Sequence, residues 1–309
     1  MRRIVLLLAV AVALPAADRD FNGRWDITVG DANRGQRAWW LEIRGAGTTS
    51  LQGYFTGFRG GDTNKIENIN IENGELRFSS DLGGAHHEFN ARVVVTAKGP
   101  KLEGERKSGN EVLRWTGVPA PDIDQHDDGS WKSSKAIELF DGKSLSGWHG
   151  RLPDRSLGWS VEDGVLKCTG SANDLVTEQK FWNFDLHVEY RISADSNSGI
   201  ALRGRYEVQI LDDHGKKPDL HSNGSLYSRV APAVNASKPA GEWQSYDIRL
   251  VGLDVTVVLN GRKVIDKAHI DGLTAMGFDA NESMPGPIAL QGDHGPVEFR
   301  RISITPLVR

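Results

Sequence analysis

The sequence YEVQIL, at residues 206–211, alternates apolar and polar side chains. Successive side chains of a β-strand point to opposite faces of the sheet. We therefore expect the tyrosine, valine and isoleucine of this stretch in a core, and Glu207 and Gln209 on the opposite face. The stretch predicts an antiparallel sheet with one buried face and a second face that carries polar groups.

The same alternation recurs on both sides of this strand, from residue 137 to the end of the chain. The dipeptides Asp163-Gly164 and Asn260-Gly261 each separate two alternating runs. Such dipeptides are preferred in two-residue β-hairpin turns, because both positions require a positive φ. Residues 137–309 therefore predict an all-β fold, a sandwich of two antiparallel sheets.

The first part of the chain shows short alternating runs as well, between residues 18 and 118. Asn73-Gly74 marks a hairpin among them, and no run has the period of a helix. The pattern predicts a small antiparallel β-barrel or sandwich, lipocalin-like in appearance, as an accessory domain. Residues 119–136 are rich in proline and then in aspartate, without an apolar period, so we expect a linker there.

The N-terminus has the three parts of a secretory signal. Two arginines precede the apolar run at residues 4–14, and the small-residue sequence PAA follows at 15–17. We therefore expect residues 1–17 to be a signal peptide and the protein to be exported, to the periplasm or out of the cell. The apolar run is too short to span a bilayer, and no other run approaches that length, so no stable membrane insertion is expected.

Charge and cysteine content narrow the partners further. The formal net charge is -4, whereas nucleic-acid binding relies on a basic face, so no nucleic-acid partner is expected. The single cysteine, Cys168, cannot form an internal disulfide, and its alternating surroundings favour an inert side chain. We expect no nucleotide cofactor, and the sequence does not indicate an oligomeric state.

Six motifs follow one another in the second half of the chain. They are LFDGKSLSGW at 139–148, NSGIALRG at 197–204, YEVQILDD at 206–213, KPAGEWQ at 238–244, VVLNG at 257–261, and GPIALQGDHG at 286–295, which leads into VEFR at 297–300. In this order they resemble the 3-keto-disaccharide hydrolase family over residues 137–307. The resemblance implies a concanavalin-like jelly-roll sandwich, related in shape to laminarinase-type glycosidases and legume lectins. It also implies cleavage of glycosides whose sugar is oxidised at carbon 3.

The strand 206–211 departs from the laminarinase-type pattern at one position. Glu207, Gln209 and Asp212 parallel the carboxylate-bearing strand of those enzymes, with Gln209 where a central aspartate would stand. This departure argues against a double displacement by two neighbouring carboxyl groups. A 3-keto group offers another route, because it acidifies the hydrogen on carbon 2 and permits elimination of the leaving group, followed by addition of water.

The elimination route assigns roles to a few side chains. Either His294 or Glu207 could be the base, and either Arg203 or a bound cation could stabilise the enolate. Two structural alternatives stay open: Glu207 and Arg203 could form an ion pair without a catalytic role, and Asp293-His294-Gly295 could be a tight turn before the last strand.

Further polar and aromatic residues complete the predicted site. The expected substrate-binding residues are Gln209, Asn197, Lys238, Trp148, Trp159 and Gln291. One divalent metal ion, calcium or a transition metal, is also expected, because carboxylates and imidazole are suitable ligands. Its candidate ligands are Asp212, Asp213, Asp293 and His221, and the alternative for the histidine is an exposed loop tip.

The sequence is compatible with three functions. The first is an exported enzyme that cleaves 3-keto-glycosides, with a carbohydrate as its substrate. The second is a carbohydrate-binding module or lectin, because the same sandwich can bind sugar without cleaving it. The third is a glycosidase that acts on unoxidised sugars. Loss of activity with retained sugar binding on Glu207→Gln would favour an enzyme over a module.

Overall fold

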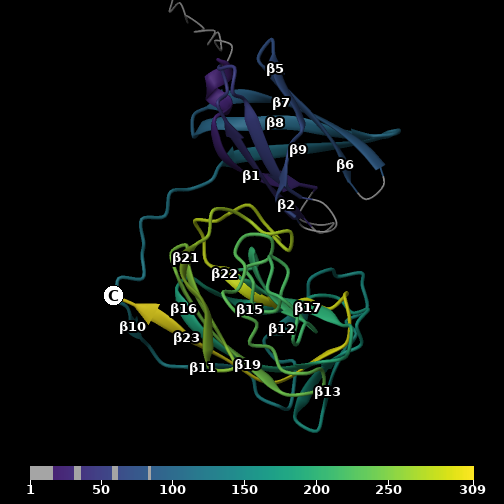
Figure 1. Ribbon diagram of the computed structural model, residues 1–309, viewed down its shortest axis with the longest axis vertical. Coiled ribbons are helices and arrows are strands. Elements are labelled where there is room, and N and C mark those ends of the chain that lie inside the picture. Colours follow the sequence, from purple (N-terminus) through teal and green to yellow (C-terminus); the bar gives the residue numbers. More distant parts are fainter. Residues whose placement is uncertain (1–16, 31–35, 58–61, 83–84) are drawn as a thin grey trace, which may run out of the picture.

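The computed structural model describes residues 17–30, 36–57, 62–82 and 85–309 (Figure 1). Almost all of the predicted signal peptide therefore lies outside the described residues. The described chain is all-β, with strands throughout and one short 3-10 helix, η1 (Asp18–Phe21), before the first strand. No helix in these ranges is long and apolar enough to cross a membrane.

The first nine strands form one antiparallel sheet, the N-terminal sheet, in the order β4-β3-β2-β1-β9-β8-β7-β6-β5. They are β1 (Gly23–Val29), β2 (Arg37–Arg44), β3 (Gln52–Thr56), β4 (Asn64–Lys65), β5 (Asn68–Glu72), β6 (Glu75–Leu82), β7 (Ala85–Thr96), β8 (Gly99–Ser108) and β9 (Glu111–Pro119). The sheet curls around an aromatic core that includes the stacked rings of Phe78 and Phe89, whose centroids lie 4.4 Å apart. It corresponds to the predicted lipocalin-like element. The first strand in sequence, β1, pairs with the last, β9, and the edge strands of the sheet are β4 and β5.

The rest of the chain forms two facing sheets, the sandwich. The larger has the order β13-β14-β23-β16-β19-β20-β21, with β10 and β11 also paired to β23, and the smaller has the order β12-β15-β22-β17-β18. The strands are β10 (Lys132–Ser133), β11 (Ile137–Phe140), β12 (Trp148–Gly150), β13 (Trp159–Glu162), β14 (Val165–Cys168), β15 (Leu175–Phe181), β16 (Phe184–Ile192), β17 (Asn197–Leu202), β18 (Tyr206–Leu211), β19 (Gln244–Val251), β20 (Asp254–Leu259), β21 (Arg262–His269), β22 (Gly286–Leu290) and β23 (Val297–Val308).

The predicted fold class, all-β with a jelly-roll sandwich preceded by a small antiparallel β-barrel or sandwich, is confirmed. The Asx-Gly turn signals that predicted this fold lie at the expected positions. The pairs Asn73-Gly74, Asp163-Gly164 and Asn260-Gly261 each connect two paired strands, and all six residues have φ between 52° and 79°. These angles are the positive values that such turns demand.

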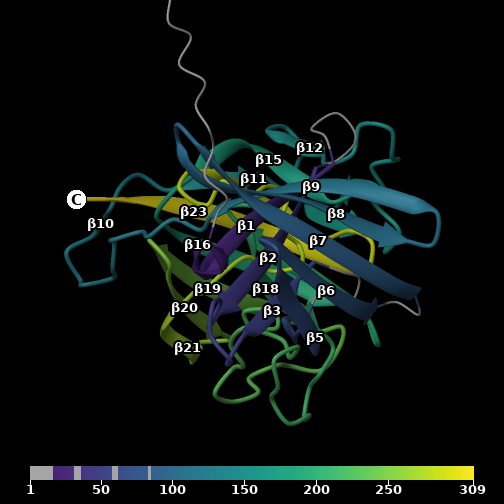
Figure 2. The same cartoon turned by 90° about the horizontal axis from the view of Figure 1, so that it is seen from above.

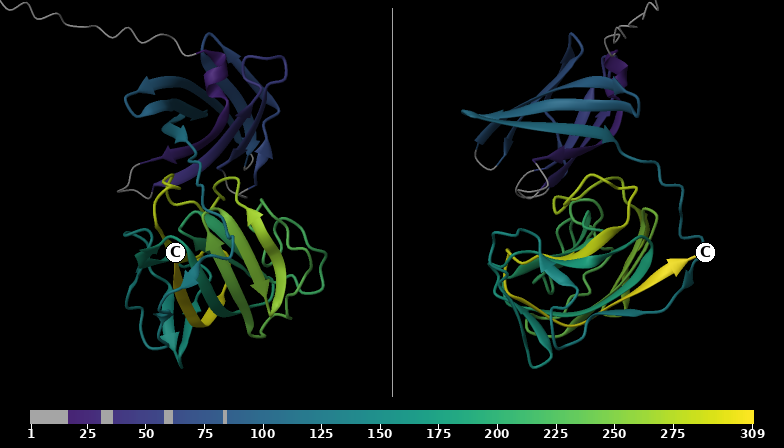
Figure 3. Two further views of the ribbon diagram at one scale, coloured as in Figure 1. Left: turned by 90° about the vertical axis from the view of Figure 1, so that its left-hand side faces the viewer. Right: turned by 180° about the vertical axis from the view of Figure 1, so that it is seen from behind.

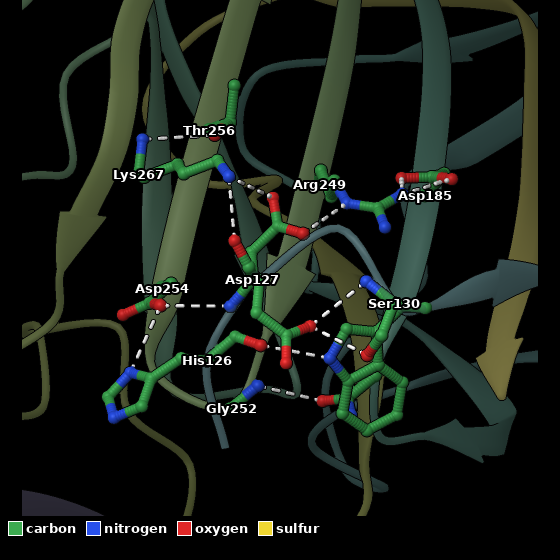
Figure 4. Close-up of polar contacts among 12 residues, drawn as sticks. His126, Asp127, Ser130, Asp185, Arg249, Gly252, Asp254, Thr256 and Lys267 are labelled. Atoms are coloured by element: carbon green, nitrogen blue, oxygen red, sulfur yellow. Dashed lines mark hydrogen bonds and ion pairs between the residues drawn. The ribbon is translucent and has the colours of Figure 1, made fainter. Parts of the chain in front are cut away.

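The segment after β9 is tied to the outside of the larger sheet (Figure 4). Asp254 accepts hydrogen bonds from the backbone N–H of Asp127 (3.1 Å) and pairs with His126 Nδ1 (3.2 Å). The Asp127 side chain is 9% exposed and faces Arg249 Nε at 3.3 Å and Lys267 Nζ at 3.7 Å. The acidic stretch of the expected linker is therefore held by specific contacts, because its carboxylate meets two cations of the sheet.

The N-terminal sheet rests on the end of the sandwich, against the loop between β21 and β22 (Figures 1, 2 and 3). The guanidinium of Arg229 lies 4.2 Å from the ring centre of Trp40 and donates hydrogen bonds to Thr56 Oγ1 and to the carbonyl of Leu273. A side chain at Gly272 would meet Trp40 at 2.2 Å, so the backbone of this loop packs directly on the indole. Trp40 accordingly belongs to the same buried cluster as the sandwich core.

We expect Asp254→Ala to destabilise the protein by about 1–3 kcal/mol, because the substitution removes the acceptor of the Asp127 N–H. Denaturant unfolding measures this cost, and limited proteolysis between residues 120 and 131 should become faster. The matched control is Asp266→Ala, which breaks an ion pair with Lys263 in which the aspartate is 60% exposed. A shift within about 0.5 kcal/mol is expected for the control. Equal stability of the two variants would contradict the tethering role.

Candidate active site

Strand register assembles the candidate site on the face of the smaller sheet that points away from the sandwich core. Ala201 of β17 lies opposite both Glu207 of β18 and Ala289 of β22. Two residues further along these strands, Gly199 of β17 lies opposite Gln209 of β18. The carbonyl of Gly199 accepts a hydrogen bond from the backbone N–H of Gln291 at 2.9 Å. One face of the sheet therefore carries Glu207 and Gln209 of β18 and also Gln291, directly after β22, as the alternation of the sequence predicts for the first two.

A small apolar patch forms part of the same face. Val176, Ala201, Met276 and Ala289 make up a buried cluster of their own, with Phe278 packed against it. All four side chains are buried, with at most 7% exposed, so the cluster packs the strands of this face against the loop that carries Met276.

Glu207 is buried on this face, with 4% of the residue exposed. Burial raises the pKa of its carboxyl group to about 8, and the nearby His294 opposes this rise while Asp174 and Asp293 add to it. Gly199 makes the position possible, since a Cβ there would stand 2.3 Å from Glu207 Oε1. The site therefore holds a carboxylic acid that is mostly protonated at neutral pH.

His294 and Asp293 form a hydrogen-bonded pair at the edge of the site. His294 Nδ1 and Asp293 Oδ1 are 2.6 Å apart, and the imidazole side chain is 51% exposed. The hydrogen bond that His294 donates to Asp293 raises the pKa of His294, and the charges of Asp293, Glu207 and Asp174 act in the same direction. The same contact lowers the pKa of Asp293. An imidazole fixed through Nδ1 presents Nε2 to whatever lies over the face.

Asp174 and Arg151 belong to the site, although the sequence did not single them out. Asp174 precedes β15, its Oδ1 accepts a hydrogen bond from the Gly292 N–H at 3.2 Å, and burial raises the pKa of its carboxyl group. Arg151 Nη1 lies 3.4 Å from Asp174 Oδ2, and its guanidinium lies 4.1 Å from the ring centre of Phe278. No local pattern marks these residues, because the strand order β15-β22-β17 brings them to the site.

Three buried amide oxygens have no hydrogen-bond partner among the described residues. They are Asn197 Oδ1, Gln209 Oε1 and Gln291 Oε1. An unpaired buried acceptor is costly, so such groups call for a donor, which an ordered water or a ligand can supply. Sugar hydroxyls are donors of this kind. The sequence predicted all three as substrate-binding residues, and the structure places them on β17, on β18 and directly after β22.

The prediction that Arg203 lies beside Glu207 is wrong. Arg203 is fully buried, its Nε donates to the carbonyl of Trp182 at 2.6 Å, and its guanidinium lies 3.8 Å from the Trp182 ring centre. The residue has a φ of 53°, so the chain has already left the strand alternation that would have aimed it at the site. Its contacts give it a structural role.

Three of the predicted substrate-binding residues also lie elsewhere. Trp148 and Trp159 belong to the sandwich core, where their indole N–H groups donate to the carbonyls of Leu139 (2.6 Å) and Asn173 (2.7 Å). Lys238 Nζ donates to the carbonyl of Trp243 at 2.9 Å, next to β19 of the other sheet. The sequence predicts both tryptophans as substrate-binding residues, but their large apolar area fills the core.

The four residues predicted as metal ligands are held in separate arrangements. Asp212 accepts from the Asp195 N–H, and Asp213 is buried between Ser237 Oγ and the Asn223 N–H. Asp293 pairs with His294, as described above. His221 pairs with Asp62 of the N-terminal part of the chain. Among the described residues no group of three or more His, Cys, Asp or Glu side chains is arranged to hold an ion, so these donors do not fit a single metal.

Comparison with known proteins connects this face to a family. Residues 135–305, more than half of the chain, match the family model of the 3-keto-alpha-glucoside-1,2-lyase-like domain. A 3-keto-disaccharide hydrolase of Bacteroides thetaiotaomicron is 28% identical over 286 residues, which cover 70% of this chain and 95% of the relative.

Two solved structures from Parabacteroides distasonis, both described as candidate glycosyl hydrolases, were also matched. One is 32% identical and covers 61% of this chain and 92% of its own, and the other is 25% identical and covers 56% and 94%; the TM-score is 0.48 for each. The predicted family resemblance is confirmed by the family model. The chain belongs to the family of the 3-keto-alpha-glucoside-1,2-lyase-like domain and is a carbohydrate-active hydrolase.

Proposed function

We propose that the protein is exported and cleaves glycosides whose sugar carries a ketone at carbon 3. The observation that carries the proposal is a buried Glu207, with a pKa of about 8, within the electrostatic reach of the Asp293–His294 pair. Two titratable groups whose environments set different proton affinities are the usual source of a general acid and a general base. The name of the Bacteroides relative, a 3-keto-disaccharide hydrolase, supports the choice of substrate.

The chemistry begins at the hydrogen on carbon 2, which the neighbouring ketone makes acidic. Nε2 of His294 takes this proton, and the electron pair of the C–H bond forms an enolate. The enolate then expels the oxygen on carbon 1, and the carboxyl group of Glu207 gives that oxygen its proton. Water adds across the resulting carbon 1–carbon 2 double bond, and the net reaction is hydrolysis.

Other side chains of the face would bind and orient the sugar. The three unpaired amide oxygens would accept hydrogen bonds from its hydroxyl groups. Arg151 and Arg155 carry the positive charge that an enolate oxygen requires, and Arg155 Nη1 lies 3.8 Å from Asp293 Oδ2. No step is assigned to a metal, because the predicted ligands do not converge.

Product analysis by mass spectrometry tests the proposal. The protein without residues 1–17 is incubated with a 3-keto-disaccharide and with its unoxidised parent, each with and without a chelator. Release of sugar from the keto substrate alone is expected. Cleavage of both substrates would indicate an ordinary glycosidase, and cleavage of neither would leave a sugar-binding protein. Loss of activity with the chelator, restored by added metal, would show that an ion takes part in the reaction.

We expect the pH profile of kcat/KM to fall above about pH 8, because Glu207 must be protonated to serve as the acid. Glu207→Gln should lower kcat for the 3-keto-disaccharide by about 10²–10⁴-fold. The loss should be much smaller for a 3-keto p-nitrophenyl glycoside, whose leaving group departs without a proton. An equal loss on both substrates would contradict the acid role and favour a role in binding.

The raised pKa of Glu207 also predicts a pH dependence of stability. The unfolded carboxyl group ionises near pH 4.3, so between that pH and about 8 the native state holds a proton that the unfolded state releases. The free energy of unfolding should therefore fall with rising pH, by up to about 1.4 kcal/mol per unit. Glu207→Gln should make this slope shallower, and the slope that remains comes from other buried carboxyl groups such as Asp26, whose pKa burial raises to about 10. Denaturant unfolding at pH 5, 6, 7 and 8 measures the difference. The exposed Glu242→Gln is the control, and an unchanged slope in Glu207→Gln would refute the assignment.

A further inference from the structure

A side chain of the N-terminal sheet reaches the rim of the candidate active site. Asp62, which precedes β4, pairs through Oδ1 with Nε2 of His221 in the loop after β18. The next residue, Thr63, donates its backbone N–H to Ser228 Oγ at 2.8 Å. The side chains of Asp62 and His221 are 45% and 42% exposed, so the pair is accessible from solvent.

His221 lies next to the strand that carries Glu207. Its ring centre is 5.0 Å from that of Tyr227, and the planes meet at 48°. The backbone N–H of Tyr227 donates to the carbonyl of Glu207 at 3.0 Å, so Tyr227 borders β18 at the catalytic position. Burial raises the pKa of Tyr227 to about 12, and the charges of Glu207 and Asp62 add to this rise.

The N-terminal part of the chain also contacts the opposite side of the site. Arg151 Nη2 donates to the carbonyl of Gln36 at 3.1 Å while Nη1 faces Asp174. Between these two contacts, the packing of Trp40 on Arg229 and Gly272 holds the N-terminal sheet in place. The N-terminal part of the chain therefore contacts the sandwich at Arg151 as well as at His221. The N-terminal sheet lies against one end of the sandwich (Figure 3).

We propose that Asp62 is a positioning residue of the active site, which holds His221 so that its Nδ1 binds the leaving-group sugar of a disaccharide. The inference rests on the proposed function. An imidazole whose Nε2 is engaged by a carboxylate has only Nδ1 left for a ligand, and the pairing fixes both the tautomer and the ring orientation. The ring of Tyr227 beside it offers the apolar surface on which a sugar packs.

The position of the pair explains why it would act on the leaving group. Glu207 protonates the departing oxygen, and Tyr227 and His221 extend from Glu207 toward the N-terminal sheet. The reacting keto sugar would cover the neighbouring row of Gln209, Gly199 and Gln291. A second sugar unit would then reach His221, whereas a methyl group in its place would not.

Steady-state kinetics on the full chain without residues 1–17 test the inference. Asp62→Asn should raise KM for a 3-keto-disaccharide about tenfold and leave kcat nearly unchanged, because the contact is made equally in the ground state and the transition state. KM for the 3-keto methyl glycoside should not change. The matched control is Asp81→Asn, since Asp81 forms the same kind of pair with His86 in the N-terminal sheet, at 2.6 Å. Equal kinetics of the two variants on the disaccharide would overturn the inference.

A labelling experiment gives a readout that does not depend on turnover. Glu207→Gln is treated with diethyl pyrocarbonate, and each histidine is followed by mass spectrometry with and without the 3-keto-disaccharide. The sugar should protect His221 and leave His86 unprotected, and the protection should be lost when Asp62→Asn is added.

The two experiments separate the failure of the inference from that of the proposed function. If the protein with wild-type Glu207 cleaves no keto substrate, the proposed function fails while the labelling still decides whether sugar reaches His221. If the disaccharide is cleaved and His221 is not protected, the inference alone fails. Protection of both histidines to the same degree would also overturn it.

Discussion

The burial of one carboxyl group governs the chemistry and much of the surrounding structure. Glu207 lies under its neighbours with its pKa raised to about 8, and it fits there because Gly199 on the adjacent strand has no side chain. Any larger residue at that position would collide with the carboxylate oxygen. Burying an ionisable group away from water lowers the stability of the protein, and such a loss of stability is typical of functional sites. The hydrophobic cores of the sandwich and of the N-terminal sheet must supply that stability.

One loop links this burial to the N-terminal sheet. The segment between β21 and β22 supplies Met276 and Phe278 to the floor of the site, and Thr274 Oγ1 accepts the backbone N–H of Glu207 at 3.0 Å. The same segment supplies Gly272 to the packing on Trp40, and the Gly277 carbonyl accepts the Ala38 N–H at 3.1 Å. A displacement of the N-terminal sheet would therefore move the loop whose Thr274 hydroxyl binds the backbone N–H of Glu207.

Local patterns predicted the fold well, because hairpins and strands are encoded within a few residues. Alternation placed Glu207 and Gln209 on the correct face, and the Asx-Gly pairs marked their turns. Prediction failed where the outcome depends on distant parts of the chain. The positive φ at Arg203 redirects its side chain, and Asp174 and Asp62 reach the site through strand order and through contact between two sheets. Neither effect leaves a signal in the neighbouring sequence.

The glutamine at position 209 fits the proposed elimination better than a double displacement. A retaining glycosidase needs an ionised nucleophile beside a protonated acid, with the two carboxyl groups about 5 Å apart. Gln209 is the next residue of β18 that lies on the same face as Glu207. Its buried amide oxygen can accept a hydrogen bond, but it does not serve as a nucleophile. Further carboxylates, Asp174 and Asp293, are engaged by Arg151 and His294. The proposed elimination requires a neutral acid, an imidazole held by an aspartate, and a row of hydrogen-bond acceptors. It requires no nucleophile, because the ketone itself activates the sugar by acidifying the hydrogen on carbon 2.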